Sequence, residues 1–139
     1  MEDQLISFET AKLAKEKGFL LQTDRCYSTE RLLFEVHNKG YSPKSDTWDW
    51  LFVHKNYQTD LMFPAPTQSL LQRWLREKHN FHIHITLQQF GFGYMFAIIN
   101  ISECYCVRNL TGGPNHKFTY EEALEAGLQE TLKLIPKEI

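Results

Sequence analysis

The sequence predicts an α+β fold with the element order α-β-β-α-β-β-α, in which three helices pack on an antiparallel sheet of about four strands. Three segments repeat apolar residues with the helical period, and one segment alternates apolar and polar residues as a half-buried strand does. Glycines that suit a tight turn follow this strand. No linker, repeat or low-complexity tract divides the chain, so we expect residues 1–139 to form a single domain.

The first two predicted helices have recognisable ends. One runs over about 8–17, with Ser7 as its N-cap and Gly18 in the position after its end, where a left-handed residue is favoured. The other lies within residues 63–80 and carries Pro66 near its first turn, where a missing N–H costs nothing. Both have one apolar face and one charged face, which is typical of helices that lie on a surface.

The third predicted helix begins with a capping box. Thr119 and Glu122 have the spacing at which each side chain satisfies the other's backbone N–H. The helix is expected to run to about Ile135, because Pro136 cannot continue it. Gly127 lies in its apolar stripe and permits a close approach of the backbone to a neighbouring element.

The predicted strands differ in how clearly the sequence marks them. Two apolar runs, at 32–36 and 48–53, are separated by turn residues. Residues 81–88 alternate strictly, with the apolar side chains expected to point inward. A short turn leads to a strand at 94–101, which must therefore run antiparallel to the strand before it, and a further short strand is expected at 104–107.

Composition excludes several classes of protein. Of the 139 residues 42% are hydrophobic and 14% are aromatic, which is typical of a globular chain, and the formal charge is only −2, so no overall field favours nucleic acid or anionic membrane. There is no apolar run of membrane-spanning length and no signal-peptide pattern at the start. Three cysteines cannot all pair within one chain, which favours free thiols in the cytoplasm.

Trp48, Trp50 and Phe52 are the strongest candidates for a protein contact. They lie on one side of the predicted strand at 48–53, and aromatic residues concentrate in interface hot spots. Packing of the same stripe in the core is the competing interpretation. If part of the stripe is exposed, binding of a protein partner or formation of a homo-oligomer is the simplest consequence.

A weaker candidate is a metal site formed by His82, His84, Cys104 and Cys106. Two histidines two residues apart on a strand project to one face, and the cysteines would complete a zinc ligand set if a neighbouring strand supplied them. The Cys-x-Cys spacing is tighter than that of most structural zinc sites. The alternative is that the histidines are ordinary residues of a polar face, so we expect no metal, no cofactor and no enzymatic activity. The same cysteines and histidines could form a nucleophilic Cys–His pair, but the sequence indicates no third residue that would orient the histidine.

Arg73, Arg76 and Lys78 are the candidates for nucleic-acid binding. They lie on the polar face of the second predicted helix, close to aromatic residues of the predicted sheet. Glu77 interrupts this group, however, and such alternation of charge is typical of a solvated helix face.

Three segments, FETAKLAKEKGF, APTQSLLQRWLREKHN and TYEEALEAGLQETLKLI, together resemble a family of short proteins of unknown function encoded by bacteriophages, prophages and the bacteria that carry them. The resemblance covers about a third of the chain and implies expression from a phage or prophage gene in a bacterial cytoplasm. It carries over no activity and no catalytic residues.

The C-terminal half is also similar to the antitoxin domain of small RNA-targeting toxin–antitoxin modules, because a hairpin, a loop and the TYEEALEAGL helix follow one another. It departs from that pattern by lacking a Pro-Gly pair at the strand end and a DNA-binding tail after Ile135. We therefore expect a small non-enzymatic accessory protein that acts through protein contacts. The alternatives are a nucleic-acid-binding module, an antitoxin-like regulator, and a metal or thiol enzyme.

Overall fold

A computed structural model describes residues 4–21, 23, 25–37, 47–49, 62–88, 91–111 and 117–136. The chain divides into two compact units. The N-terminal unit comprises Leu5–Pro66 with Lys137–Ile139, and the C-terminal unit comprises Thr67–Pro136 with Met1–Gln4. The expectation of a single domain stays a prediction, since two compact units can unfold either together or separately.

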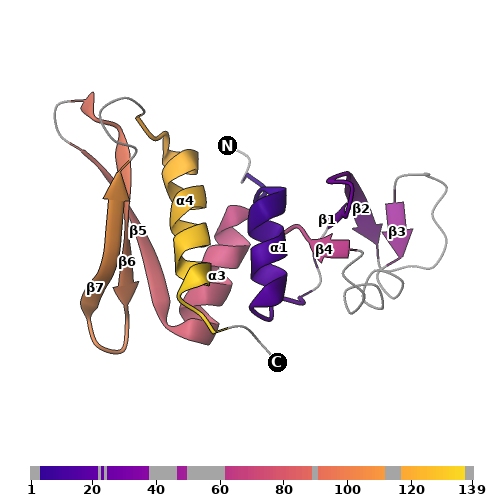
Figure 1. The fold of residues 1–139 in the computed structure, drawn as a ribbon, viewed down its shortest axis with the longest axis horizontal. Helices are drawn as coiled ribbons and strands as arrows, with labels where there is room; N and C mark the ends of the chain where they lie inside the picture. Colours follow the sequence, from indigo (N-terminus) through magenta and orange to yellow (C-terminus); the bar gives the residue numbers. More distant parts are fainter. Residues whose placement is uncertain are drawn as a thin grey trace. The chain divides into compact units, whose positions relative to one another are not determined.

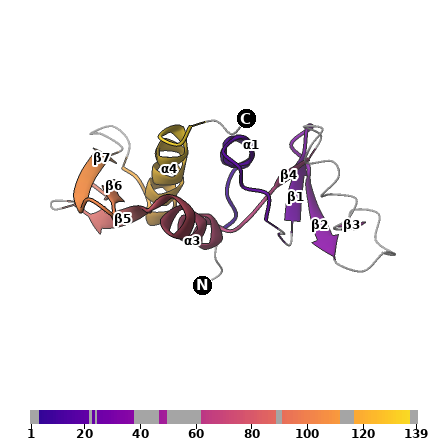
Figure 2. The ribbon, with the colours of Figure 1, turned by 90° about the horizontal axis from the view of Figure 1, so that it is seen from below.

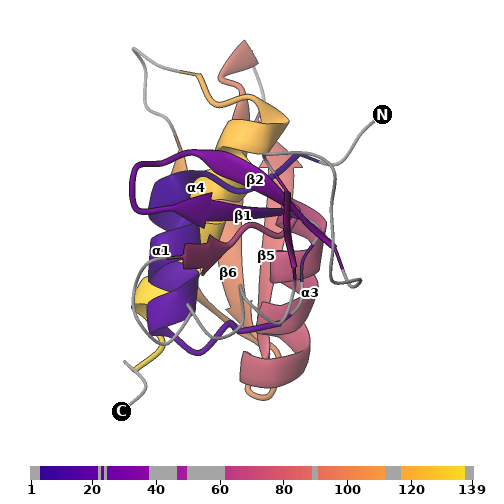
Figure 3. The same ribbon diagram turned by 90° about the vertical axis from the view of Figure 1, so that its right-hand side faces the viewer.

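Among the residues that the structure describes, the N-terminal unit contains one helix and a four-stranded sheet with the strand order β3-β2-β1-β4 (Figure 1). Its elements are α1 (Phe8–Glu16), β1 (Arg25–Ser28), β2 (Leu33–His37), β3 (Thr47–Asp49) and β4 (Met62–Pro64). Strand β1 runs antiparallel to β2 and to β4, whereas β2 and β3 are parallel. Figure 3 shows β1, β2 and β4 together with α1.

Aromatic contacts and hydrogen bonds from side chains to backbone carbonyls join α1 and the residues just before it to this sheet. The Phe8 ring makes edge-to-face contacts with Tyr27 and Phe63, at centroid distances of 5.7 and 5.4 Å. The Tyr27 hydroxyl donates to the Ile6 carbonyl at 2.8 Å, and the Lys15 ammonium donates to the Met62 carbonyl at 2.9 Å. The helix is therefore tied to β1 and β4 at several points along its length.

The C-terminal unit contains a three-stranded antiparallel sheet in the order β5-β6-β7, with two helices on one of its faces (Figures 1 and 2). Its elements are α3 (Gln68–His79), β5 (Phe81–Leu87), β6 (Tyr94–Asn100), β7 (Tyr105–Thr111) and α4 (Tyr120–Lys133). Asn80 ends α3 in the left-handed conformation, with φ of 61°, and the chain passes directly into β5. Because of this reversal, β5 runs alongside α3 in the opposite direction.

The core of this unit lies between the sheet and the two helices. Its largest fully buried apolar side chains come from both helices and from the sheet: Leu71, Leu75, Ile83, Phe96, Ile98, Leu128 and Leu132. A Cβ at Gly127 would lie 2.8 Å from Ile83 Cγ2 and 3.2 Å from Phe96 Cβ, so only glycine allows α4 to approach the sheet this closely. The buried Gln68 amide donates to the Glu121 carbonyl and to Glu125, at 3.1 and 3.0 Å, and so joins α3 to α4.

The structure confirms the α+β class, the three helices and the antiparallel pairing of β5 with β6. The strands lie in two sheets, however, rather than in the single antiparallel sheet that we expected, and β2 and β3 pair in parallel. Strands β1 and β4 were not predicted, because runs of three or four residues show no usable period. Pro66 lies near the first turn of α3, directly before the N-cap residue Thr67.

Candidate functional site

Helix α3 packs against β5, which is an edge strand of the three-stranded sheet. The Gln72 side chain donates to the Ile83 carbonyl at 2.9 Å, which fixes this face of the helix against the strand. Arg76 follows Gln72 by four residues and therefore lies one turn further along the same face. Its side chain is exposed, and its charge acts on His82 at the start of β5.

His82 and His84 lie on the face of the sheet opposite the core, because alternate residues of a strand point to opposite sides and Ile83 is buried. Their ring centroids are 6.3 Å apart. The pKa of His82 is lowered from its ordinary value, first by partial burial and then by the charges of Arg76 and His84. The lowered pKa favours the neutral form of His82.

The three predicted nucleic-acid residues are all exposed on α3, but they differ in their partners. Arg73 forms an ion pair of 3.0 Å with Glu77, one turn further along the helix. Within the described part of the chain, neither Arg76 nor Lys78 has an acidic partner. Arg76 is therefore the residue of this group that is both near another candidate side chain and available to a ligand.

The register of the sheet separates the four candidate metal ligands. His82 pairs with Ile99 of β6, and Ile99 pairs with Cys106 of β7, so a whole strand lies between the imidazole and the thiol. Two strand spacings are about 10 Å, whereas zinc binds its ligands at about 2.0–2.3 Å. Cys104 lies in the turn before β7. The histidines, cysteines and acidic residues among the described positions form no group of three that could hold a metal ion.

Cys26 does not have the properties of a nucleophile. Its side chain is completely buried in the N-terminal unit, and this burial raises the pKa of the thiol to about 12. The thiolate is the reactive form of cysteine, so Cys26 is inert near neutral pH. Cys104 and Cys106 are exposed, and their thiols donate weakly to the carbonyls of Ile101 and Arg108.

Only one of the three predicted interface residues lies within the described part of the chain. Trp48 is the central residue of β3 and pairs with Val36 of β2. Trp50 and Phe52 lie outside the described residues. The predicted contact through this aromatic stripe therefore stays a prediction.

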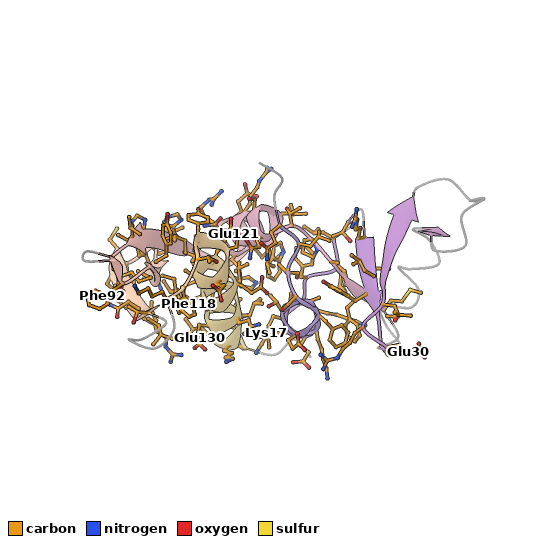
Figure 4. All side chains as sticks on the ribbon, turned by 90° about the horizontal axis from the view of Figure 1, so that it is seen from above. Lys17, Glu30, Phe92, Phe118, Glu121 and Glu130 are labelled. Atoms are coloured by element: carbon orange, nitrogen blue, oxygen red, sulfur yellow. The ribbon has the colours of Figure 1, made fainter. Side chains whose placement is uncertain are left out.

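The structure shows an apolar surface that the sequence did not indicate, at the end of the β5–β6 hairpin. Four large hydrophobic side chains are about half exposed or more: Leu87 at 62%, Phe92 and Leu110 at 49%, and Tyr120 at 47%. We call these four residues, together with Tyr94, the hairpin-end patch. Leu87 pairs with Tyr94 across the strands, and the Tyr94 and Tyr120 rings make an edge-to-face contact at 5.7 Å. Figure 4 shows Phe92 at this end of the unit.

The hairpin-end patch exists because β5 is longer than the helix that covers it. The hydrogen bond from Gln72 to Ile83 provides a common reference point for α3 and β5. Gln68, the first residue of α3, lies four residues from Gln72, and Leu87, the last residue of β5, lies four residues from Ile83. Four residues advance about 6 Å in a helix but about 14 Å in a strand. Leu87 therefore lies on the face of the sheet that the helices cover, but beyond the end of α3. The prediction that the Leu87 side chain points into the core is wrong.

Comparison with protein-family models, with curated proteins and with solved structures gives no match for this chain. Among the described residues, no helix combines the length and the apolar character needed to cross a membrane.

Proposed function

We propose that the protein is a small non-enzymatic accessory protein that binds another protein through the hairpin-end patch. The observation that carries this proposal is the exposure of four large hydrophobic side chains of the hairpin-end patch: Leu87, Phe92, Leu110 and Tyr120. Contiguous exposed apolar surface is typical of interaction sites. The phage or prophage setting in a bacterial cytoplasm is part of the proposal and rests on the resemblance of the three segments described above.

The composition of the patch suits protein binding better than binding of a small molecule. Tyrosine and phenylalanine supply large contact areas and have few rotatable bonds, so little side-chain entropy is lost when a partner covers them. The edge-to-face contact of Tyr94 with Tyr120 already fixes two of the rings. Such preorganisation lowers the cost of association.

The proposal can be tested with one charged substitution in the patch. Leu87→Glu places a carboxylate where the native side chain is 62% exposed, so the charge stays solvated in the free protein but must be desolvated in a complex. Thr86→Glu is the matched control, because Thr86 is the exposed preceding residue and points to the opposite face of β5. Tagged wild-type protein and both variants are used as baits in phage-infected cells, and the captured proteins are identified by mass spectrometry.

We expect the wild-type protein and Thr86→Glu to capture the same partner and Leu87→Glu to lose it, with unchanged far-UV circular dichroism for all three. Capture of one partner to equal extents by Leu87→Glu and by the wild-type protein would contradict binding through the hairpin-end patch.

A further inference from the structure

Arg76, His82 and His84 form a group of basic side chains that lacks an acidic counterpart. The charges that act on His82 come from Arg76 and His84, and both oppose its protonation. The nearest acid on α3 in sequence, Glu77, pairs with Arg73. Within the described residues, no carboxylate therefore compensates these three groups.

The positions of the three side chains are fixed by neighbouring elements. The hydrogen bond from Gln72 to Ile83 holds the Arg76 face of α3 along β5. The strand itself holds the two imidazoles on one face, at a centroid distance of 6.3 Å. Their cross-strand neighbours on β6 are Ile99 and Ala97, which bring no charge, and Ala97 is small enough to leave room beside His84.

We propose that Arg76, His82 and His84 bind a phosphate group. A guanidinium recognises two phosphate oxygens at once, and protonated imidazoles donate to the remaining oxygens. The phosphate can belong to the backbone of a polynucleotide or to a free phosphate ion, since both present the same charged oxygens. This proposal is independent of the hairpin-end patch, whose residues it does not use.

Protonation and binding should be coupled at this site. A bound anion favours the charged imidazole, so it raises the pKa of His82 from its lowered value, and the affinity rises as the pH falls from about 7.5 to about 5.5. The other charged or titratable side chains of α3 near this edge are Arg73, Glu77, Lys78 and His79. Because His79 is also an imidazole, the pKa values of His82 and His84 are followed individually.

Two probes with constant charge test the proposal. Inorganic sulfate is a tetrahedral dianion over this pH range and represents a free phosphate ion, while a single-stranded RNA oligonucleotide presents phosphodiesters. The pKa of His82 and of His84 is measured by NMR of the imidazole Cε1–H signals with and without each probe. Arg76→Gln is the test variant, and Arg73→Gln is the matched control on the same helix, since both residues are exposed.

We expect the probe to raise the pKa of His82 in the wild-type protein and in Arg73→Gln. In Arg76→Gln we expect about tenfold weaker binding, which corresponds to one lost charge-assisted hydrogen bond. Effects of both probes would identify the polynucleotide backbone as the source of the phosphate, and an effect of sulfate alone would identify a free ion. The proposal is overturned if neither probe changes the pKa of His82, or if Arg73→Gln weakens binding as much as Arg76→Gln.

Discussion

At the scale of single residues, Gly127 decides how closely α4 approaches the sheet. Replacement of a helical glycine by alanine normally stabilises a protein by about 1 kcal/mol. Here the added methyl group would lie 2.8 Å from Cγ2 of Ile83, a stiff β-branched side chain, and 3.2 Å from two atoms of Phe96. We therefore expect Gly127→Ala to destabilise the protein by about 1–3 kcal/mol, as measured by chemical denaturation.

A double-mutant cycle isolates this contact. Ile83→Ala removes the Cγ2 methyl group that the new side chain would meet, so Gly127→Ala should cost less in that background than in the wild-type protein. Equal costs in both backgrounds, or a stabilising Gly127→Ala, would show that α4 does not lie this close to Ile83.

The candidate phosphate site also shows what single residues reveal before a structure is known. Both His82 and Arg76 stood out in the sequence, but as members of different candidate sites. Their proximity depends on the left-handed Asn80, which turns the chain so that β5 runs back along α3. The separation of the four candidate metal ligands was hidden for a related reason, because no spacing within one strand indicates that β6 lies between His82 and Cys106.

At the scale of elements, the capping box at the start of α4 makes a clear contribution to stability. The Thr119 hydroxyl accepts from the Glu122 N–H at 3.1 Å, and the Glu122 carboxylate accepts from the Thr119 N–H at 3.0 Å. We expect Thr119→Ala to lower the free energy of unfolding by about 1 kcal/mol, because the Glu122 N–H loses its hydroxyl acceptor. Thr119→Ser is the control that keeps the acceptor. If both variants have the same denaturation midpoint, the hydroxyl does not cap the helix.

The helices could be predicted because their signals are local. Ser7 accepts from the Thr10 N–H at the start of α1, and Thr119 forms the capping box of α4. Asn80 adopts the left-handed conformation at the end of α3. Each of these residue types marks a helix end in the sequence itself. Strand β4 has no such mark. It becomes a strand through pairing with β1, in which Cys26 lies opposite Pro64, and a pairing between distant segments leaves no period within three residues.

At the scale of the whole molecule, the two compact units raise the question of how many cooperative units the chain contains. The C-terminal unit has its own core, in which α3, α4 and the sheet meet around Ile83 and Phe96. We expect a fragment of residues 67–136 to fold alone and to unfold in one cooperative thermal transition of modest stability, because a domain of this size is near the lower limit for a single core. Circular dichroism of the fragment measures this.

The full-length protein provides the comparison for that experiment. If the fragment gives a random-coil spectrum while the full-length chain is folded, the C-terminal unit depends on the rest of the chain, and the single-domain prediction for residues 1–139 is favoured. Separate transitions in the full-length chain, one of which matches the fragment, would instead indicate two domains.

The hydrogen bond from Gln72 to the Ile83 carbonyl also bears on aggregation. Strand β5 has the sequence FHIHITL, which is rich in β-forming residues and contains no proline, no glycine and no acidic or basic residue other than histidine. Exposed strand edges of this composition recruit further strands and lead to fibrils. Gln72 occupies an outward-facing carbonyl in the middle of this edge, so an incoming strand would have to break that bond before it could add to the sheet. We therefore expect this amide side chain of α3 to hinder the addition of a further strand at the edge of the folded sheet.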